Sequence, residues 1–216
     1  MNKIIPIAAA AAVALAITLA WAPEAAADTG KIAILEARQT SDANPWGGAA
    51  ADAMRFQCLW LQRDIDYAGY VDKVEFESLG APMAHFYNCR ILLCHTNRTA
   101  LVSNFATNYG GNTPVEVYPS RARSMGGSGW VNAQIMSRVF NYNNRDNLLM
   151  EIVWNGDSGR DVVCYLGAAT ARRCYAYNHQ SPTGRVSHDS QRIRLTIGVY
   201  TGLDDTSLGR VKTLFR

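Results

Sequence analysis

Apolar and polar side chains alternate with a period of two along much of the chain, and this pattern constrains the fold more than any other feature. In the segment 54–61 the even positions are apolar, whereas Arg55 and Gln57 occupy odd positions; the segment 70–76 alternates in a similar way. Successive side chains of a strand point to opposite faces, so such segments are predicted to be half-buried strands. The pattern predicts about nine or ten short strands: 32–35, 54–61, 70–76, 85–95, 115–118, 130–140, 148–154, 162–165, 174–177 and 192–199.

Turn residues separate these predicted strands. Gly and Asn, which tolerate the positive φ angles of tight turns, cluster at 109–112, 126–129 and 141–144. No long helical stripe lies between the strands. The sequence therefore predicts an all-β fold, a two-sheet antiparallel β-sandwich or jelly roll, as one domain over residues 28–203.

The composition allows this fold and excludes several others. Of the 216 residues, 48% are hydrophobic and 18% are charged, so a core can form and general disorder is excluded. Lys and Arg number 21 against 18 acidic residues, a net charge of +3, and the basic residues are scattered. We therefore expect no nucleic-acid partner.

The N-terminus has the composition of a secretory signal peptide. A positive start at 1–3 precedes an apolar stretch at 4–21, and small residues follow as far as Ala27. Signal peptidase accepts only small side chains there, so residues 1–27 are the predicted signal peptide, cleaved between Ala27 and Asp28. A retained membrane anchor is the alternative, because the apolar run approaches the roughly 20 residues that span a bilayer. After cleavage no membrane span is expected, which predicts a secreted, extracellular or cell-surface protein, with the periplasm as a further option.

All five cysteines follow this segment, which fits an oxidising compartment. Cys164 and Cys174 flank a stretch at 166–173 that is rich in Gly, Ala and Thr and is predicted to be a hairpin. We therefore predict a disulfide between Cys164 and Cys174. Cys89 and Cys94 lie on opposite faces of one predicted strand and are not expected to pair.

Five segments of the chain together match the order of motifs in a known family. They are Arg55-Phe-Gln-Cys-Leu-Trp-Leu61, Cys89-Arg-Ile-Leu-Leu-Cys-His-Thr96, Gly129-Trp130, Asp146-Asn-Leu-Leu-Met-Glu-Ile152 and Arg192-Ile-Arg-Leu-Thr196. Through them, over about residues 50–197, the chain resembles a family of secreted bacterial β-sandwich, jelly-roll-like surface modules with Gly-His-Thr and Asn-Leu-Leu-x-Glu strands. Cys94 stands where that family has Gly. The resemblance implies export and a sandwich fold, and it implies adhesion or assembly with no catalytic residues to carry over.

Residues 204–216 form a separate C-terminal tail. Leu208, Val211 and Leu214 recur at helical spacing. The ending resembles short C-terminal segments of exported bacterial proteins, which implies a docking or sorting segment. A tail packed on the sandwich is the alternative.

The sequence contains no motif for nucleophilic catalysis or for zinc. None of the four histidines belongs to a nucleophile motif, and no Cys-x-x-Cys occurs. Asn155, Asp157 and Asp161 place oxygen atoms in a Gly-rich loop, so calcium is a candidate ligand there, and no other cofactor is expected. Asn-Gly-Asp is also ordinary hairpin chemistry, which is the alternative interpretation.

Strand carboxylates are the candidates for glycoside hydrolysis, which needs a pair of them in a groove. These residues are Glu75, Glu77 and Glu151. Glu75 and Glu77 share one strand face, and alternation alone predicts that this face is solvated.

Aromatic residues are the candidates for binding. Trp60 and Trp154 occupy apolar strand positions and are predicted to lie in the core. Trp46 and Tyr109 lie in Gly-containing loops, so we predict that they are exposed and stack on sugar rings or anchor a protein partner.

These observations favour a non-catalytic secreted or cell-surface β-sandwich module for interaction, adhesion or extracellular assembly. Its partner would be another protein, a second copy of the chain or a glycan. One alternative is a carbohydrate-binding protein or weak glycan hydrolase that uses loop aromatics and strand carboxylates. Another is a structural subunit of an extracellular polymer.

Overall fold

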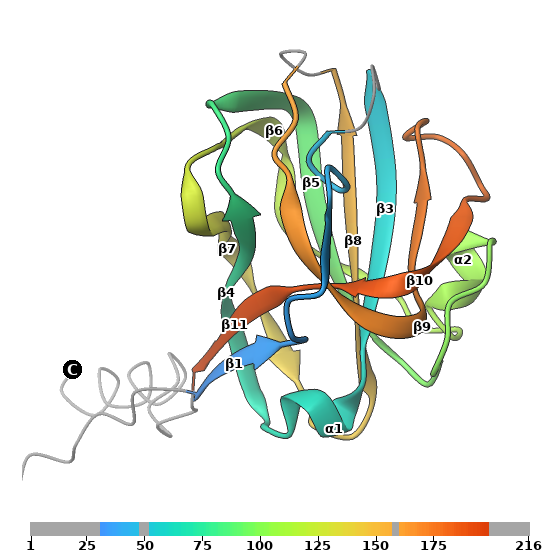
Figure 1. Ribbon diagram of the computed structural model, residues 1–216. Helices are drawn as coiled ribbons and strands as arrows, with labels where there is room; N and C mark the ends of the chain where they lie inside the picture. The colour runs from blue at the N-terminus through green and yellow to red at the C-terminus, as the bar shows by residue number, and fades with distance from the viewer. Residues whose placement is uncertain (1–30, 48–51, 157–159, 199–216) are drawn as a thin grey trace, which may run out of the picture.

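The computed structural model describes residues 31–47, 52–156 and 160–198 (Figure 1). The predicted signal peptide, with its cleavage site at Ala27 and Asp28, lies outside the described residues. The same holds for the tail at 204–216 and for Asp157 of the predicted calcium loop.

The described chain is all-β, as the alternation predicts. Its strands are β1 (Lys31–Leu35), β2 (Thr40–Asp42), β3 (Ala53–Trp60), β4 (Gly69–Leu79), β5 (Ala84–Thr96), β6 (Val115–Met125), β7 (Ser128–Tyr142), β8 (Asn147–Asn155), β9 (Cys164–Ala176), β10 (Arg185–Gln191) and β11 (Ile193–Gly198). Two one-turn helices, α1 (Gln62–Ile65) and α2 (Phe105–Asn108), interrupt them. The pairings between these strands are antiparallel.

The strands pair in the order β1-β11-β4-β9-β3-β8-β5-β6, with β2 and β10 on β9 and with β7 on β4 (Figure 1). β3 pairs with β8 along its whole length. By contrast, the pairing given for β4 and β9 is the single residue pair Ser78 and Cys164. A narrow link therefore joins β1, β11, β4 and β7 to the remaining strands.

The central strands are buried on both faces. Along β8, Leu148 to Trp154 are all buried; the even positions belong to the main core, whereas Leu149 belongs to a smaller cluster with Phe105 of α2. The even positions of β3 also lie in the main core, which confirms the face predicted from the alternation, and Trp60 and Trp154 are core residues as predicted. The segment that carries α2 thus closes the second face of β3 and β8.

The stretch 166–173 is not the hairpin that its small residues predict, because β9 continues through it from Cys164 to Ala176. The small residues serve close packing instead. A Cβ atom at Gly167 would lie 2.4 Å from the Glu36 side chain, so glycine there lets the connection between β1 and β2 pass close to β9.

The predicted disulfide between Cys164 and Cys174 is wrong for the same reason. Cys174 pairs with Val186 of β10, whereas Leu166 pairs with Gln191, five residues further along that strand. At 3.4 Å per residue, Leu166 and Cys174 are about 17 Å apart along the strands, and Cys164 lies two residues beyond Leu166. A disulfide needs Cα atoms within about 7 Å of each other. Both cysteines are free thiols.

All five cysteine thiols are free and buried. Burial raises the pKa of Cys94 and Cys174 to about 11, and that of Cys58, Cys89 and Cys164 to about 12. Thiols kept protonated and out of solvent react slowly.

We predict that iodoacetamide adds five groups to the unfolded, unreduced chain and far fewer to the folded chain, because every thiol is free and buried. Mass spectrometry after alkylation in native buffer and in guanidinium checks this. A wild-type mass with three or fewer groups in guanidinium would demonstrate a disulfide and contradict the prediction.

Candidate functional site

One outer surface of the molecule combines arginines, a tryptophan and two buried glutamates. We call it the Arg–Trp face, and it comprises Arg38, Lys73, Glu75, Glu77, Trp130, Arg192 and Arg194. Alternation creates it: Ile193 and Leu195 of β11 and Val74 and Phe76 of β4 point into the core, so the residues between them point outward. In Figure 1, β11 and β1 cross the near side of the molecule, and no labelled element lies over them.

Glu75 is held by the neighbouring strand. Arg194 is its register partner on β11 and donates two hydrogen bonds to its carboxylate, from Nε at 2.6 Å and from Nη2 at 2.7 Å. The ammonium group of Lys73 lies 3.3 Å from the same carboxylate. Burial alone would raise the pKa of Glu75, but the hydrogen bonds from Arg194 and Lys73 outweigh it and lower that pKa.

Glu77 is held by two arginines from other parts of the chain. Arg38 donates to both of its oxygens, and Arg192 donates from Nε to Oε2 at 2.5 Å. The hydrogen bonds from Arg38, together with those from Arg192, lower the pKa of Glu77 to about 2. The carboxylate is therefore ionised over the whole physiological range.

The prediction that Glu75 and Glu77 are solvated is wrong. Their exposed fractions are 5% and 3%, because the arginines and Lys73 surround both carboxylates. A carboxylate with a lowered pKa is a poor general acid. This geometry does not suit the glycan-hydrolase role considered for these residues.

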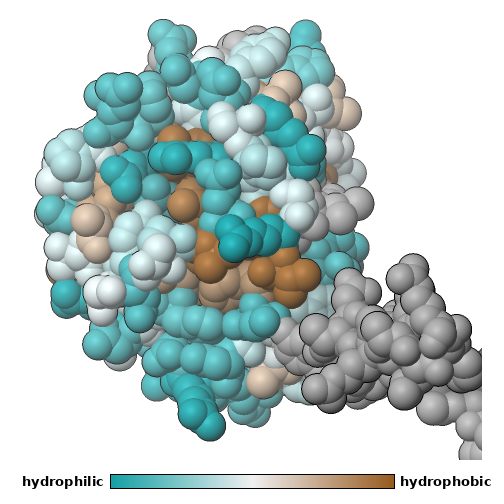
Figure 2. All heavy atoms as spheres, turned by 180° about the vertical axis from the view of Figure 1, so that it is seen from behind, coloured by the Kyte–Doolittle hydropathy of each residue, from teal (hydrophilic) through white to brown (hydrophobic). Residues whose placement is uncertain are grey.

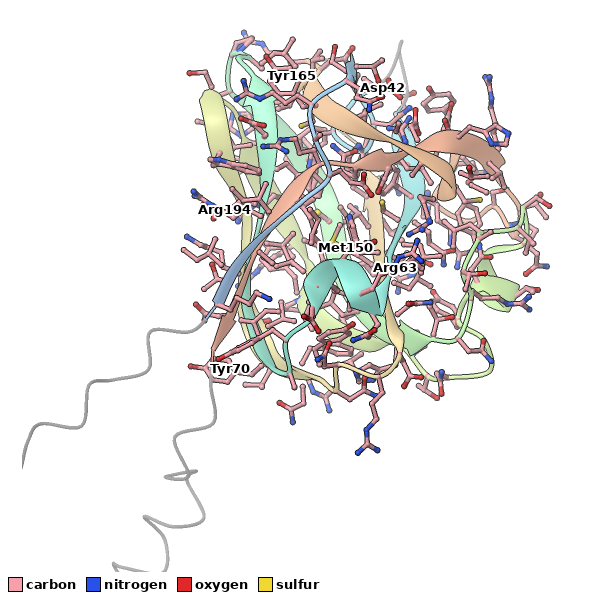
Figure 3. The ribbon with its side chains drawn as sticks, turned by 60° about the horizontal axis from the view of Figure 1, so that its bottom comes forward. Asp42, Arg63, Tyr70, Met150, Tyr165 and Arg194 are labelled. Atoms are coloured by element: carbon pink, nitrogen blue, oxygen red, sulfur yellow. The ribbon has the colours of Figure 1, made fainter. Side chains whose placement is uncertain are left out.

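Trp130 completes the face. It is the register partner of Glu77 on β7, and the guanidinium carbons of Arg192 and Arg194 lie 5.3 and 5.1 Å from its ring centre, within cation–π range. The guanidinium carbon of Arg38 lies 4.6 Å from the ring centre of Tyr165 in the same manner. Figure 3 shows the side chains with the bottom of the molecule brought forward, and it labels Arg194 of the face and Tyr165, whose ring lies beside Arg38.

The sequence predicted no binding role for Trp130, Arg38, Arg192, Arg194 or Tyr165, although Gly129-Trp130 and the segment from Arg192 to Thr196 carry the family resemblance. The relevant signal is the pair of matching patterns Glu75-x-Glu77 and Arg192-x-Arg194, which have opposite charge and the same period of two. The sequence does not show that their strands are neighbours.

Trp46 is not the exposed binding residue that its loop position predicts. It is fully buried, with its ring centre 5.5 Å from that of Phe76 and 5.4 Å from that of Phe86. The adjoining Trp154 donates a hydrogen bond from its indole nitrogen to the Pro45 carbonyl, at 2.8 Å. The loop before β3 therefore folds over the core and cannot present Trp46 to a partner.

Tyr109 is half-buried, and its hydroxyl points inward to a buried carboxylate instead of facing a partner as predicted. Its hydroxyl donates to Oε2 of Glu151 at 2.6 Å, and Gln57 donates to the same oxygen at 2.5 Å. Arg55 donates from Nε to Oε1 at 3.1 Å. Burial and the nearby Glu151 charge raise the pKa of Tyr109, so its hydroxyl stays protonated. The network ties the α2 segment to β3 and β8.

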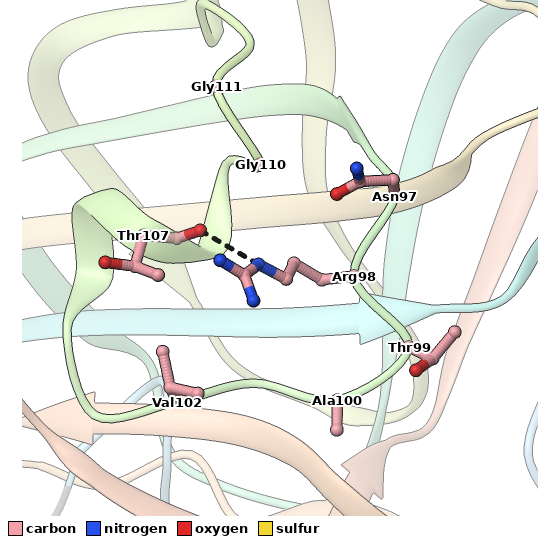
Figure 4. A pocket seen from close by; sticks show the side chains of 8 residues that line it. All are labelled: Asn97, Arg98, Thr99, Ala100, Val102, Thr107, Gly110 and Gly111. Carbon is pink, nitrogen blue, oxygen red and sulfur yellow. Dashed lines mark hydrogen bonds between the residues drawn. The ribbon is translucent and has the colours of Figure 1, made fainter.

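A hollow lies beside Tyr109 on the same segment (Figure 4). Its volume is about 760 Å³, and it is lined by Asn97, Arg98, Thr99, Ala100, Val102, Thr107, Gly110 and Gly111. Arg98, the charged residue of this lining, donates to the Thr107 carbonyl at 3.2 Å. The lining provides no pair of acid and base.

The predicted calcium loop is only partly described. Asn155 and Asp161 are exposed, and Asp157 is outside the described residues. Within the described ranges, no group of three or more His, Cys, Asp or Glu side chains is placed to hold a metal ion. The calcium site stays a prediction.

The space-filling view in Figure 2 shows the side of the molecule opposite to that in Figure 1. Apolar side chains gather near its centre, with hydrophilic ones around them. Among residues 31–47, 52–156 and 160–198, no helix has the length and apolar character needed to cross a membrane.

Comparisons of the chain with protein-family models, with curated proteins and with solved structures gave no match.

Replacing Glu77 with Gln is expected to lower the melting temperature at neutral pH, and the difference from wild type should shrink as the pH falls. The pKa of Glu77 is about 2 in the folded chain against an ordinary 4.5. A carboxylate whose pKa is lowered in the folded chain contributes stability above its ordinary pKa. This contribution is lost as the pH falls towards the pKa of the folded state. Calorimetry at several pH values between neutrality and pH 2.5 measures this.

Glu116→Gln is the matched control, because Glu116 is exposed on β6 and makes no ion pair with a described residue. A melting-temperature difference for Glu77→Gln that is the same at pH 7 and pH 2.5 would contradict the prediction.

Tyr109→Phe tests whether Tyr109 has an internal role. Loss of the hydroxyl leaves a buried carboxylate with one hydrogen bond fewer, which should reduce the free energy of unfolding by about 1 to 3 kcal/mol. Urea denaturation measures the effect, with Tyr177→Phe as the control because Tyr177 is 54% exposed. Equal stability of Tyr109→Phe and wild type would show that the hydrogen bond is not formed in solution.

Proposed function

We propose that the protein is a non-catalytic, secreted or cell-surface binding module, built as a two-sheet β-sandwich, that contacts its partner through the Arg–Trp face. The single observation that carries this proposal is Trp130 beside two arginines that buried glutamates hold in place. Aromatic and arginine side chains are the residue types most enriched where proteins bind partners.

The pairing pattern supports the sandwich. β4 and β9 share one residue pair, whereas the strands on either side of this link pair over longer stretches. The main core contains residues of both groups, including Phe76 of β4 and Trp154 of β8. Two sheets that face each other across one core would have this distribution.

The states of the carboxylates and thiols support a binding role over catalysis. Glu75, Glu77 and Glu151 each accept hydrogen bonds from arginine. Burial raises the pKa of all five thiols, which keeps them in the unreactive form. A catalytic acid or nucleophile needs a pKa matched to its task and access to substrate.

The Arg–Trp face also differs from an aggregation surface. Its members on β4 and β11 are the charged residues Lys73, Glu75, Glu77 and Arg194, and charged side chains oppose the stacking of this face on a second copy. We therefore favour recognition of a different molecule over assembly of identical subunits.

An array of immobilised extracellular proteins and glycans tests this function. The purified protein should be retained on at least one class of spot, and Trp130→Ala should abolish that retention while the melting temperature changes little. Tyr87→Ala is the matched control, since Tyr87 is an exposed aromatic residue on β5, away from the face.

Equal retention of wild type and Trp130→Ala would show that binding uses another surface. Absence of retention on every spot, or turnover of a spotted glycan, would also overturn the proposed function.

A further inference from the structure

We propose that the Arg–Trp face binds an acidic polysaccharide, a polymer whose sugar rings carry carboxylate groups. This inference rests on the proposed function, because it names the class of ligand for the same face. Three features carry it: arginine donors that no described residue accepts, the aromatic ring of Trp130 on β7, and the balance of charge.

Each arginine of the face keeps one terminal nitrogen that donates to no described residue. Arg194 uses Nε and Nη2 on Glu75, which leaves Nη1. Arg192 uses Nε on Glu77 and Nη1 on the Glu36 carbonyl, which leaves Nη2. Arg38 uses Nε and Nη2 on Glu77, which leaves Nη1.

These donors are oriented by ion pairs within the described chain before any ligand arrives. The carboxylates that orient the three guanidinium groups are themselves buried, so the arginines have little freedom left to lose on binding. Preorganised donors bind with a smaller entropic cost. Arg192 and Arg194 are two residues apart along the strand direction, about 7 Å, which allows them to contact successive groups of an extended chain.

Trp130 supplies an apolar surface beside Arg192 and Arg194. It is partly exposed, whereas Trp46, Trp60 and Trp154 are exposed by 1% or less. On the other side of β11, Ile34 is the register partner of Arg194 and Ile32 that of Thr196, and these isoleucines are 52% and 61% exposed. A sugar ring presents apolar C–H faces and polar edges, so a carboxylated sugar matches both the aromatic ring and the arginines.

The charge balance favours a carboxylated sugar polymer over nucleic acid. The four cations Arg38, Lys73, Arg192 and Arg194 exceed Glu75 and Glu77 by two charges, and the whole chain carries only +3. Nucleic-acid binding depends on neutralising many phosphates at once. A sparse array of oriented donors fits a polymer with one carboxylate on each ring.

Fluorescence titration of the purified protein with polygalacturonate tests the inference, with fully methyl-esterified polygalacturonate as the neutral counterpart. We expect saturable binding of the acid form and about tenfold or greater weakening for the ester, because each lost charge-assisted hydrogen bond costs about a factor of ten. Trp130→Phe should remove the fluorescence change, since the other described tryptophans are buried. Isothermal calorimetry then measures the affinity of this variant.

Two variants separate specific donors from overall charge. Glu75→Gln/Arg194→Gln replaces an ion pair with a neutral pair and leaves the net charge unchanged, so about tenfold weaker binding would identify the guanidinium donor itself. Arg121→Gln is the control, because Arg121 is also an arginine over an aromatic ring, 4.2 Å from the ring centre of Tyr118, but lies outside the Arg–Trp face. This variant loses one positive charge and should bind like wild type. Circular dichroism establishes that each variant is folded.

The outcomes distinguish the inference from the function on which it rests. Equal binding of the acid and ester forms, lost in Trp130→Ala, would overturn the acidic ligand and keep the face as the binding surface. Tighter binding of dextran sulfate or single-stranded DNA than of polygalacturonate would also overturn the acidic-sugar inference. Binding that Trp130→Ala leaves intact would overturn both proposals. Absence of binding to any polysaccharide, with retention on a protein spot that Trp130→Ala abolishes, would overturn the acidic-sugar inference alone.

Discussion

A buried carboxylate needs a cation beside it, and three buried carboxylates on the strands of this protein fix which strands become neighbours and in which register. Glu75, Glu77 and Glu151 are exposed by 5% or less, and each is held by arginine from a distant part of the sequence. Burying an unpaired charge costs several kcal/mol, comparable with the net stability of a domain. The ion pairs therefore oppose misregister: a one-residue slip of β11 against β4 would turn Arg194 towards the core and remove its two hydrogen bonds from Glu75.

The same arrangement of ion pairs has two different consequences in this molecule. Around Glu151, the α2 segment covers the arginine and the carboxylate, and Tyr109 and Gln57 complete the hydrogen bonds, so this network stabilises the interior. Around Glu75 and Glu77 the cover consists of the paired cations, with Arg38 and the Glu36 carbonyl contributed by the connection between β1 and β2, and each arginine keeps a donor that no described residue accepts. Under the proposed function, the arginines of the second network both hold these carboxylates and offer their remaining donors to a partner.

The period of two predicted those features that depend on a single strand. It identified the core face of β3, the buried Trp60 and Trp154, and the separation of Cys89 from Cys94 onto opposite faces, since Cys89 lies in the main core and Cys94 in the smaller cluster. It could not predict features that depend on which strands become neighbours. Glu75 was expected in water because the partner strand with Arg194 was unknown, and Trp46 was expected outside because alternation does not give the path of a loop. The small residues near Gly167 have two physical uses, turning and close packing, and the sequence did not distinguish them.

The buried glutamates also limit what the Arg–Trp face can bind. By neutralising part of the arginine charge they weaken long-range attraction, which acts on any polyanion and is screened by salt. The buried glutamates do not weaken directional hydrogen bonding, because the guanidinium donors stay at fixed positions beside an aromatic ring. Affinity from such a surface depends on how well acceptors and apolar groups match those positions, more than on the ligand's total charge. Such a face gives up long-range attraction for selectivity, which is what the proposed recognition of one carboxylated polymer among other polyanions requires.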